Sequence, residues 1–238
     1  MTTAEHVRRI AGSAWRFRCG VERDASARFA RLAGRLVEVG AAEPVVELAQ
    51  RASRDERRHA MLCADLAAGY GAPAPAVAAE SPSEIAPARL SRQQRVLYEV
   101  VAVCCVTETE SMGVLTQLLS SARDARLRQV LRQLARDEVH HSRLGWAHLA
   151  GECARADVSF LGPLVPAMLR GAVDPELFAP VPAERDDPAL IEHGVLPHAL
   201  KRQVFTSTLE EVVFPGLETY GVDTVPARRW LDAQAARG

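Results

Sequence analysis

Apolar residues recur every three or four positions along four long stretches of the chain, and polar residues fill the opposite faces. This spacing is the period of an amphipathic α-helix. Pro44 stands in the first turn of the second stretch, and glycines follow the first, second and fourth stretches, as is typical of helix starts and ends. The pattern predicts an all-α fold with long helices over Thr3–Val39, Glu43–Gly69, Leu90–Ser121 and Asp124–Ala150.

The connections between these stretches predict how the helices are arranged. The first and last connections are short, so each joins antiparallel neighbours. The second, APAPAVAAESPSEIAPAR, is rich in proline and alanine and has no apolar period. Its roughly 18 residues can span the whole length of a helix at about 3.3 Å per residue. Short, long and short connections are typical of a four-helix bundle with one long crossover.

The chain changes character after Gly151, where prolines become frequent. We divide the sequence into a bundle domain over 1–151 and a helical extension over 152–238 that packs on it. In the extension the pattern predicts short helices near Leu161–Gly171, His198–Phe214 and Pro226–Arg237, the second of which stops at Pro215-Gly216. The extension is expected to build the substrate side of a site; the alternative is that it forms a homodimer contact or a stabilising wrap around the bundle.

One six-residue motif occurs twice. Residues 54–59 and 136–141 both read R-D-E-x-x-H, in the second and fourth predicted helices. The composition predicts only about 0.03 copies of D-E-x-x-H by chance, so the repeat is specific. Residues at i and i+3 share a helix face, so Glu56 with His59, and Glu138 with His141, can reach one metal ion together. Each pair interrupts an apolar stripe, where an uncompensated charge would be costly.

Two metal ions require further ligands from the other two helices. Glu22 in the first helix and Glu108 in the third lie on apolar stripes at matching depth. Four glutamates and two neutral histidines would balance two divalent cations. Glu110 and Glu99 are the alternatives to Glu108. His140 is expected to lie outside the ligand set, and His148 at the edge of the core.

These motifs resemble the ferritin-like di-iron carboxylate superfamily, in which two helices each supply a Glu and two supply E-x-x-H. The form D-E-x-R-H at 55–59 is similar to that of the bacterial multicomponent monooxygenases. The resemblance implies that Asp55 and Asp137 each hydrogen-bond a ligand histidine on the opposite helix. The second copy departs from the pattern because His140 stands where an Arg is expected.

The resemblance implies a function as well as a fold. We expect an oxidoreductase that uses two iron ions, or iron and manganese, to activate O₂ and to hydroxylate or oxygenate a small organic substrate. Such an enzyme requires an electron-donor protein or another reductant. The alternatives are a ferroxidase or iron-handling protein, a rubrerythrin-like peroxide scavenger, and a metal-free helical interaction module. The long extension and the lack of a C-x-x-C motif weigh against the iron-handling and rubrerythrin-like alternatives.

Composition narrows the possible partners and the compartment. The 29 Lys+Arg nearly balance the 30 Asp+Glu, so no basic surface favours nucleic acid. The sequence contains no run of about 18 apolar residues, so it predicts no membrane span. Five cysteines, an odd number, and an N-terminus without the features of a signal peptide indicate reduced thiols in the cytoplasm.

Overall fold

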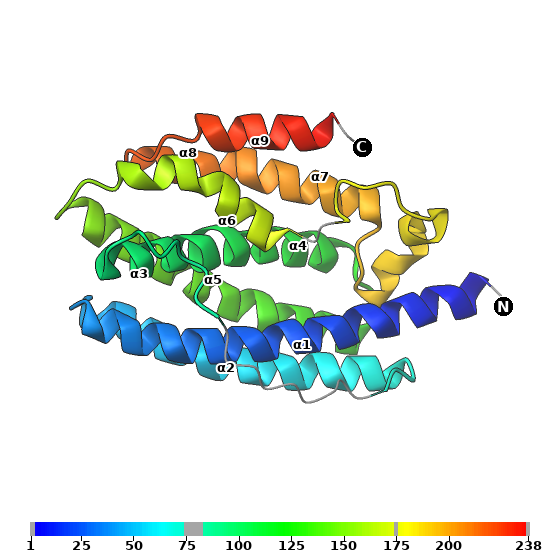
Figure 1. Ribbon diagram of the computed structural model, residues 1–238. Coiled ribbons are helices and arrows are strands. Elements are labelled where there is room, and N and C mark those ends of the chain that lie inside the picture. Colours follow the sequence, from blue (N-terminus) through cyan, green and yellow to red (C-terminus); the bar gives the residue numbers. More distant parts are fainter. Residues whose placement is uncertain (1–2, 74–82, 174–175, 237–238) are drawn as a thin grey trace.

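The computed structural model describes residues 3–73, 83–173 and 176–236, and within these ranges every regular element is helical (Figure 1). The long elements are α1 (Thr3–Glu38), α2 (Glu43–Gly69), α3 (Arg92–Val100), the π-helical η1 (Val101–Thr107), α4 (Glu108–Ser121) and α5 (Ala125–Cys153). After them come η2 (Ser159–Leu164), α6 (Val165–Ala172), η3 (Ala183–Asp186), η4 (Pro188–His193), α7 (His198–Thr208), the π-helical η5 (Leu209–Val213), α8 (Phe214–Thr219) and α9 (Val225–Ala235).

The long helices pack side by side. Helix α1 runs against α2 along most of its length, and α5 packs against both α2 and α4. Figure 1 shows α1 and α2 running in opposite directions, while α2 and the α3–η1–α4 segment run in the same direction. The expected crossover joins α2 to α3, and its residues 74–82 lie outside the described residues.

Caps and glycines set most of the helix ends. Gly40 and Gly71, at φ +67° and +77°, take the left-handed conformation just after α1 and α2. Ser91 forms a capping box with Gln94, so α3 begins at Arg92 rather than at Leu90. The expected stop at Gly151 is wrong: its φ is not positive, and α5 continues to Cys153.

Two π-helical segments depart from the regular period that the sequence predicts. The first, η1, interrupts the third predicted helix immediately before Glu108. The second, η5, precedes Pro215, and the helix then continues through this proline to Thr219 instead of stopping there. A proline lacks the backbone N–H and collides with the preceding turn, and a wider turn relieves that collision. This accounts for the continued helix.

The core of the long helices has two apolar layers. We name them the Trp15 layer and the Phe29 layer, and they lie on opposite sides of the predicted ligands along the helices. The Trp15 layer consists chiefly of Trp15, Cys19, Cys63, Leu115, Leu118, Leu131 and Leu134. The Phe29 layer consists chiefly of Phe29, Leu32, Leu36, Ala49, Ala52, Val100, Cys104 and Leu144. On every long helix the predicted ligands fall between the residues of these two layers.

The C-terminal segments cover the third helical segment. A third apolar cluster joins α6, α7, η5, α8 and α9 to α3, η1 and α5, with Phe205, Phe214 and Leu169 fully buried. In addition, Leu196 belongs to the Trp15 layer, so residues after η4 reach the core near α1. The predicted helix ending at Arg237 is described as far as Ala235, and residues 237–238 lie outside the described residues.

Among the described residues, no helix is long and apolar enough to span a membrane. The longest helices, α1 and α5, carry charged residues throughout.

Gly145 allows α5 to approach η1 closely. A Cβ atom at this position would lie 2.6 Å from the Cβ of Cys104 and 2.9 Å from the backbone N of Cys105. We therefore predict that Gly145→Ala destabilises the metal-free protein by about 1–3 kcal/mol, the usual cost of overpacking. Thermal unfolding followed by circular dichroism measures the effect. Gly34, which is helical and has open space around it, is the matched control.

Gly34→Ala should leave the melting temperature unchanged or raise it, because Ala favours a helix by about 0.5–1 kcal/mol. Equal melting temperatures for the two variants would show that the close approach at Gly145 is not needed.

Candidate metal centre

All six predicted ligands meet in one place. Their carboxylate oxygens and imidazole nitrogens form two groups, within each of which the atoms lie no more than 4.8 Å apart. Both groups contain Glu56 and Glu138, one from each copy of the repeated motif. The first group adds Glu22 and His59, and the second adds Glu108 and His141.

The cluster is a buried polar layer between the Trp15 and Phe29 layers. All six side chains are buried, and the most exposed, Glu108, retains 6% of its surface. Ser26 and Ser53 donate hydrogen bonds to each other's backbone carbonyls at 2.8 and 2.9 Å, which join α1 to α2 one turn from Glu22 and Glu56. The cluster is therefore enclosed between the two apolar layers and is kept out of contact with bulk water.

Both imidazoles turn the same nitrogen toward the cluster. His141 Nδ1 lies 2.9 Å from Glu138 and 3.0 Å from Glu56. His59 Nδ1 lies 3.2 Å from Glu56. The Nε2 atoms face outward, each toward an aspartate of the other motif. His59 Nε2 is 3.1 Å from Asp137, and His141 Nε2 is 3.6 Å from Asp55.

The two aspartates are held by an arginine that sequence reasoning assigned no role. Arg58 Nη2 donates to Asp55 and to Asp137, each at 2.7 Å. Gln133 adds a 2.8 Å bond to Asp137. Although burial alone would raise it, the pKa of Asp55 falls to about 2 because the nearby His141 imidazole and the hydrogen-bonded Arg58 guanidinium favour its charged form. Hydrogen bonds from Gln133, Arg58 and His59 likewise lower the pKa of Asp137. Both side chains are therefore ionised acceptors at neutral pH.

The pKa values of the buried glutamates are shifted in two opposite directions. Burial raises the pKa of Glu22 to about 8, and the charges of Glu56 and Glu138 add to the rise, which Arg18 opposes. The pKa of Glu108 is also well above its usual value, chiefly through burial and then through the charges of Glu138 and Glu56. Glu56 behaves oppositely, since hydrogen bonds from His141 and His59 outweigh burial and lower its pKa.

Arg18 is a second residue of the site that sequence reasoning missed. Its Nε donates to Glu22 at 2.7 Å, and its Nη2 donates to Ser111 at 3.2 Å. Ser111 Oγ in turn lies 3.5 Å from Glu138. The only sequence signal was the i, i+4 spacing of Arg18 and Glu22, which is common on helix surfaces and not specific for a site.

The alternatives to Glu108 lie elsewhere. Glu99 is fully buried, but it pairs with Arg31 and with Arg35, the latter at 2.5 Å. Glu110 is partly exposed and belongs to neither group of metal-binding atoms. Among the third helix's glutamates in the described chain, Glu108 is the one that faces the cluster.

The remaining histidines of α5 are outside the cluster. His140 is partly exposed and belongs to neither group. His148 is buried, and its pKa is lowered by burial, with the charge of Glu152 opposing the effect. Cys104 lies in the Phe29 layer, where burial raises the pKa of its thiol well above the usual value.

The donor set fits a pair of hard or borderline metal ions. Two ligands on opposite sides of one ion lie about 4.2 Å apart, twice a bond of about 2.1 Å. Each group, within 4.8 Å, is therefore close to the size that one ion requires. His141 Nε2 is buried and lacks a hydrogen-bond partner among the described residues. Binding of an ion at Nδ1 would fix the proton on Nε2 and direct it toward Asp55. The buried acidic and histidine groups could thus hold metal.

No protein-family model, curated protein or solved structure matches this chain.

Without a cation, four adjacent buried carboxyl groups cost folding free energy. We predict that Glu108→Gln raises the melting temperature of the metal-free protein, by about 2–4 °C for each kcal/mol of relieved repulsion. The amide keeps the shape of the side chain and cannot ionise, so it avoids the folding cost that the raised pKa of Glu108 reflects. Differential scanning calorimetry on chelator-treated protein measures the change. Glu47, exposed on α2, is the control, and Glu47→Gln should have no effect. A lower melting temperature for Glu108→Gln would show that the carboxylate stabilises the fold itself.

Proposed function

We propose that this chain is a di-iron oxidoreductase that activates O₂ to hydroxylate or oxygenate a small organic substrate. In this proposal α1, α2, the α3–η1–α4 segment and α5 form a ferritin-like four-helix bundle around two iron ions, or iron and manganese. The observation that carries the proposal is the doubled group of buried ligands with two shared carboxylates. Such paired sites in a helical core are typical of di-iron carboxylate proteins.

Each ligand has a role in the proposal that follows from its group. Glu56 and Glu138 belong to both groups and would bridge the two ions. Glu22 with His59 would complete one ion, and Glu108 with His141 the other. Four carboxylates and two neutral imidazoles balance two divalent cations. Carboxylate and imidazole ligands suit iron and manganese.

The surrounding residues would orient the ligands and keep water away. Asp55 and Asp137 would hold the Nε2 protons of the histidines, so that Nδ1 stays free to coordinate. Arg18 and Ser111 would steady Glu22 and Glu138. The Trp15 and Phe29 layers would exclude solvent above and below the cluster.

When bound, the iron pair would pass to O₂ the electrons that an external reductant delivers. Hydroxylation places one oxygen atom of O₂ in the product and releases the other as water, and it consumes two protons and two electrons from an external reductant. The reductant is therefore a required partner of the proposed activity.

Metal content tests the proposal directly. We predict about two iron ions per chain after growth in iron-replete medium, measured by elemental analysis, and O₂ uptake when the iron(II)-loaded chain meets air. His59→Ala and His141→Ala should lose one or both ions, because each removes an imidazole from one group. His140→Ala is the matched control and should retain both. A chain that carries only zinc, or three variants that lose metal equally, would contradict the proposal.

The outer aspartates supply a separate prediction. Asp137→Asn should keep the fold and weaken iron binding about 10–100-fold, because an amide does not accept the His59 proton as strongly. Competition with a coloured chelator measures the affinity. Asp65→Asn, at an exposed position of α2, is the control and should leave it unchanged. Equal affinities for both variants would mean that Asp137 only pairs with arginines.

A further inference from the structure

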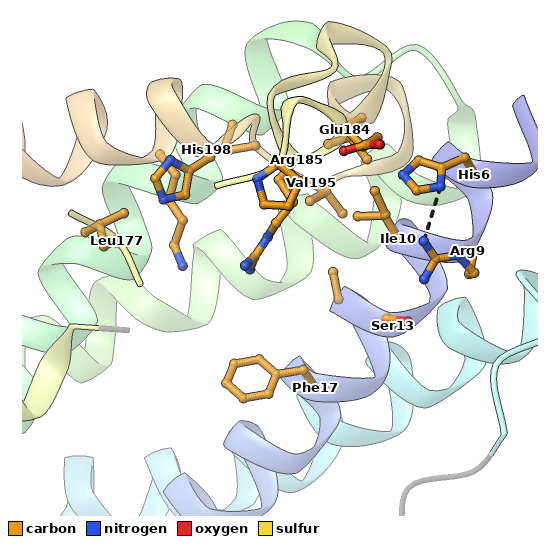
Figure 2. A pocket seen from close by; sticks show the side chains of 15 residues that line it. His6, Arg9, Ile10, Ser13, Phe17, Leu177, Glu184, Arg185, Val195 and His198 are labelled. Carbon is orange, nitrogen blue, oxygen red and sulfur yellow. Dashed lines mark hydrogen bonds between the residues drawn. The ribbon is translucent and has the colours of Figure 1, made fainter. Parts of the chain in front are cut away.

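A cleft of about 750 Å³ lies between the first half of α1 and the segments η3, η4 and α7 (Figure 2). This volume is within the range of pockets that hold small molecules. The metal cluster is a different set of residues, since none of its six side chains lines the cleft. The cleft therefore requires its own explanation.

One wall of the cleft is a straight apolar stripe on α1. Ile10, Ala14 and Phe17 follow one another at spacings of four and three residues, so they share a helix face. The stripe is about 10 Å long at 1.5 Å per residue. Phe17 is 72% exposed, which is unusual for an aromatic side chain in a cleft. A ligand with an extended apolar chain would cover this stripe and remove it from water.

Basic side chains stand at one end of this stripe. Figure 2 shows His6 and Arg9 together on the outer turns of α1, with Phe17 farther along the helix. Arg9 Nη2 lies 3.2 Å from the imidazole Nδ1 of His6, a partner without negative charge. Arg185, another lining residue, is instead paired with the carboxylate of Glu176. The His6–Arg9 end is thus suited to a carboxylate, which arginine binds through two parallel hydrogen bonds.

The other end of the stripe approaches the metal cluster. Phe17 is followed by Arg18, whose guanidinium bonds Glu22. From Phe17 to Glu22 the helix advances only about 7.5 Å. Glu22 is nevertheless turned by about 80–140° around the helix axis from the three stripe residues, and all six cluster side chains are buried, so the stripe passes the cluster on another face of α1.

We propose that this cleft is a binding site, separate from the metal centre, for a monocarboxylate with an extended apolar chain. The carboxylate lies on Arg9, and the chain lies along Ile10, Ala14 and Phe17. Binding of such a molecule does not depend on the proposed function.

Decanoate is the probe for binding, titrated by calorimetry into the metal-free full-length chain. It should bind with one molecule per chain, decanol should bind at least ten-fold more weakly, and acetate should not bind measurably. Arg9→Gln should weaken decanoate binding about ten-fold, the scale of a charge-assisted hydrogen bond. Arg16, exposed on α1 and outside the cleft, is the matched control, and Arg16→Gln should change nothing.

Two further variants separate charge from apolar contact. Glu184 is an acidic side chain of the cleft lining, so Glu184→Gln should tighten decanoate binding. Phe17→Ser should weaken decanoate and decanol alike. Absence of decanoate binding, or equal binding by Arg9→Gln and Arg16→Gln, would overturn the proposed pocket.

Cobalt(II) tests whether the cleft and the metal centre are separate sites. In the cobalt-loaded chain, saturating decanoate should leave the visible absorption bands unchanged. A change in the bands would show that decanoate reaches the metal centre and would overturn the proposal of a separate site. A chain that binds neither cobalt nor iron would instead refute the proposed function, and the decanoate titration would still decide whether the cleft binds carboxylates.

Discussion

Four glutamates buried between two apolar layers impose the constraint to which much of this structure responds. Each carboxyl group repels the others and loses its hydration, so the folded chain must supply compensation. The compensating side chains form two sets: an inner set that contacts the glutamates and an outer set that contacts the inner set. Two imidazoles lie within about 3 Å of the shared glutamates, and Arg18 bonds Glu22. A bound pair of cations would complete the neutralisation, and this need is the physical reason for proposing metal.

The outer set of side chains also fixes how the helices are arranged. The aspartate of each motif faces the histidine of the other, and Arg58 bonds both aspartates. These contacts join α2 to α5, as the Ser26–Ser53 pair joins α1 to α2. Helix α5 also needs Gly145 to approach η1, whose wide turns immediately precede Glu108. The positions of the ligands thus depend on backbone packing as well as on side-chain chemistry.

Much of the cluster could be predicted from the sequence because helix geometry is periodic. The i, i+3 spacing within each motif fixes a shared face, and the apolar residues on either side fix the depth. The same argument selected Glu22 and Glu108, and the structure brings both to the cluster. Arg18 and Arg58 were not predicted, since charged residues near a helix surface have many possible partners and their choice depends on tertiary contacts.

The departures from regular helices were also beyond sequence reasoning. A π-turn adds a residue without changing the apolar character of Val101–Thr107, so no local pattern marks it. Gly151 stops a helix only if it adopts a positive φ, and it does not. The cleft depends on how η3, η4 and α7 pack against α1. These segments are short and rich in proline, so they have no apolar period from which that packing could be predicted.

Anomalous X-ray diffraction from crystals of the iron-loaded chain, collected on both sides of the iron absorption edge, tests the central claim most directly. We expect two anomalous peaks between Glu56 and Glu138, one beside Glu22 and His59 and the other beside Glu108 and His141. A map without peaks among these six residues, or with iron bound only elsewhere on the molecule, would contradict it.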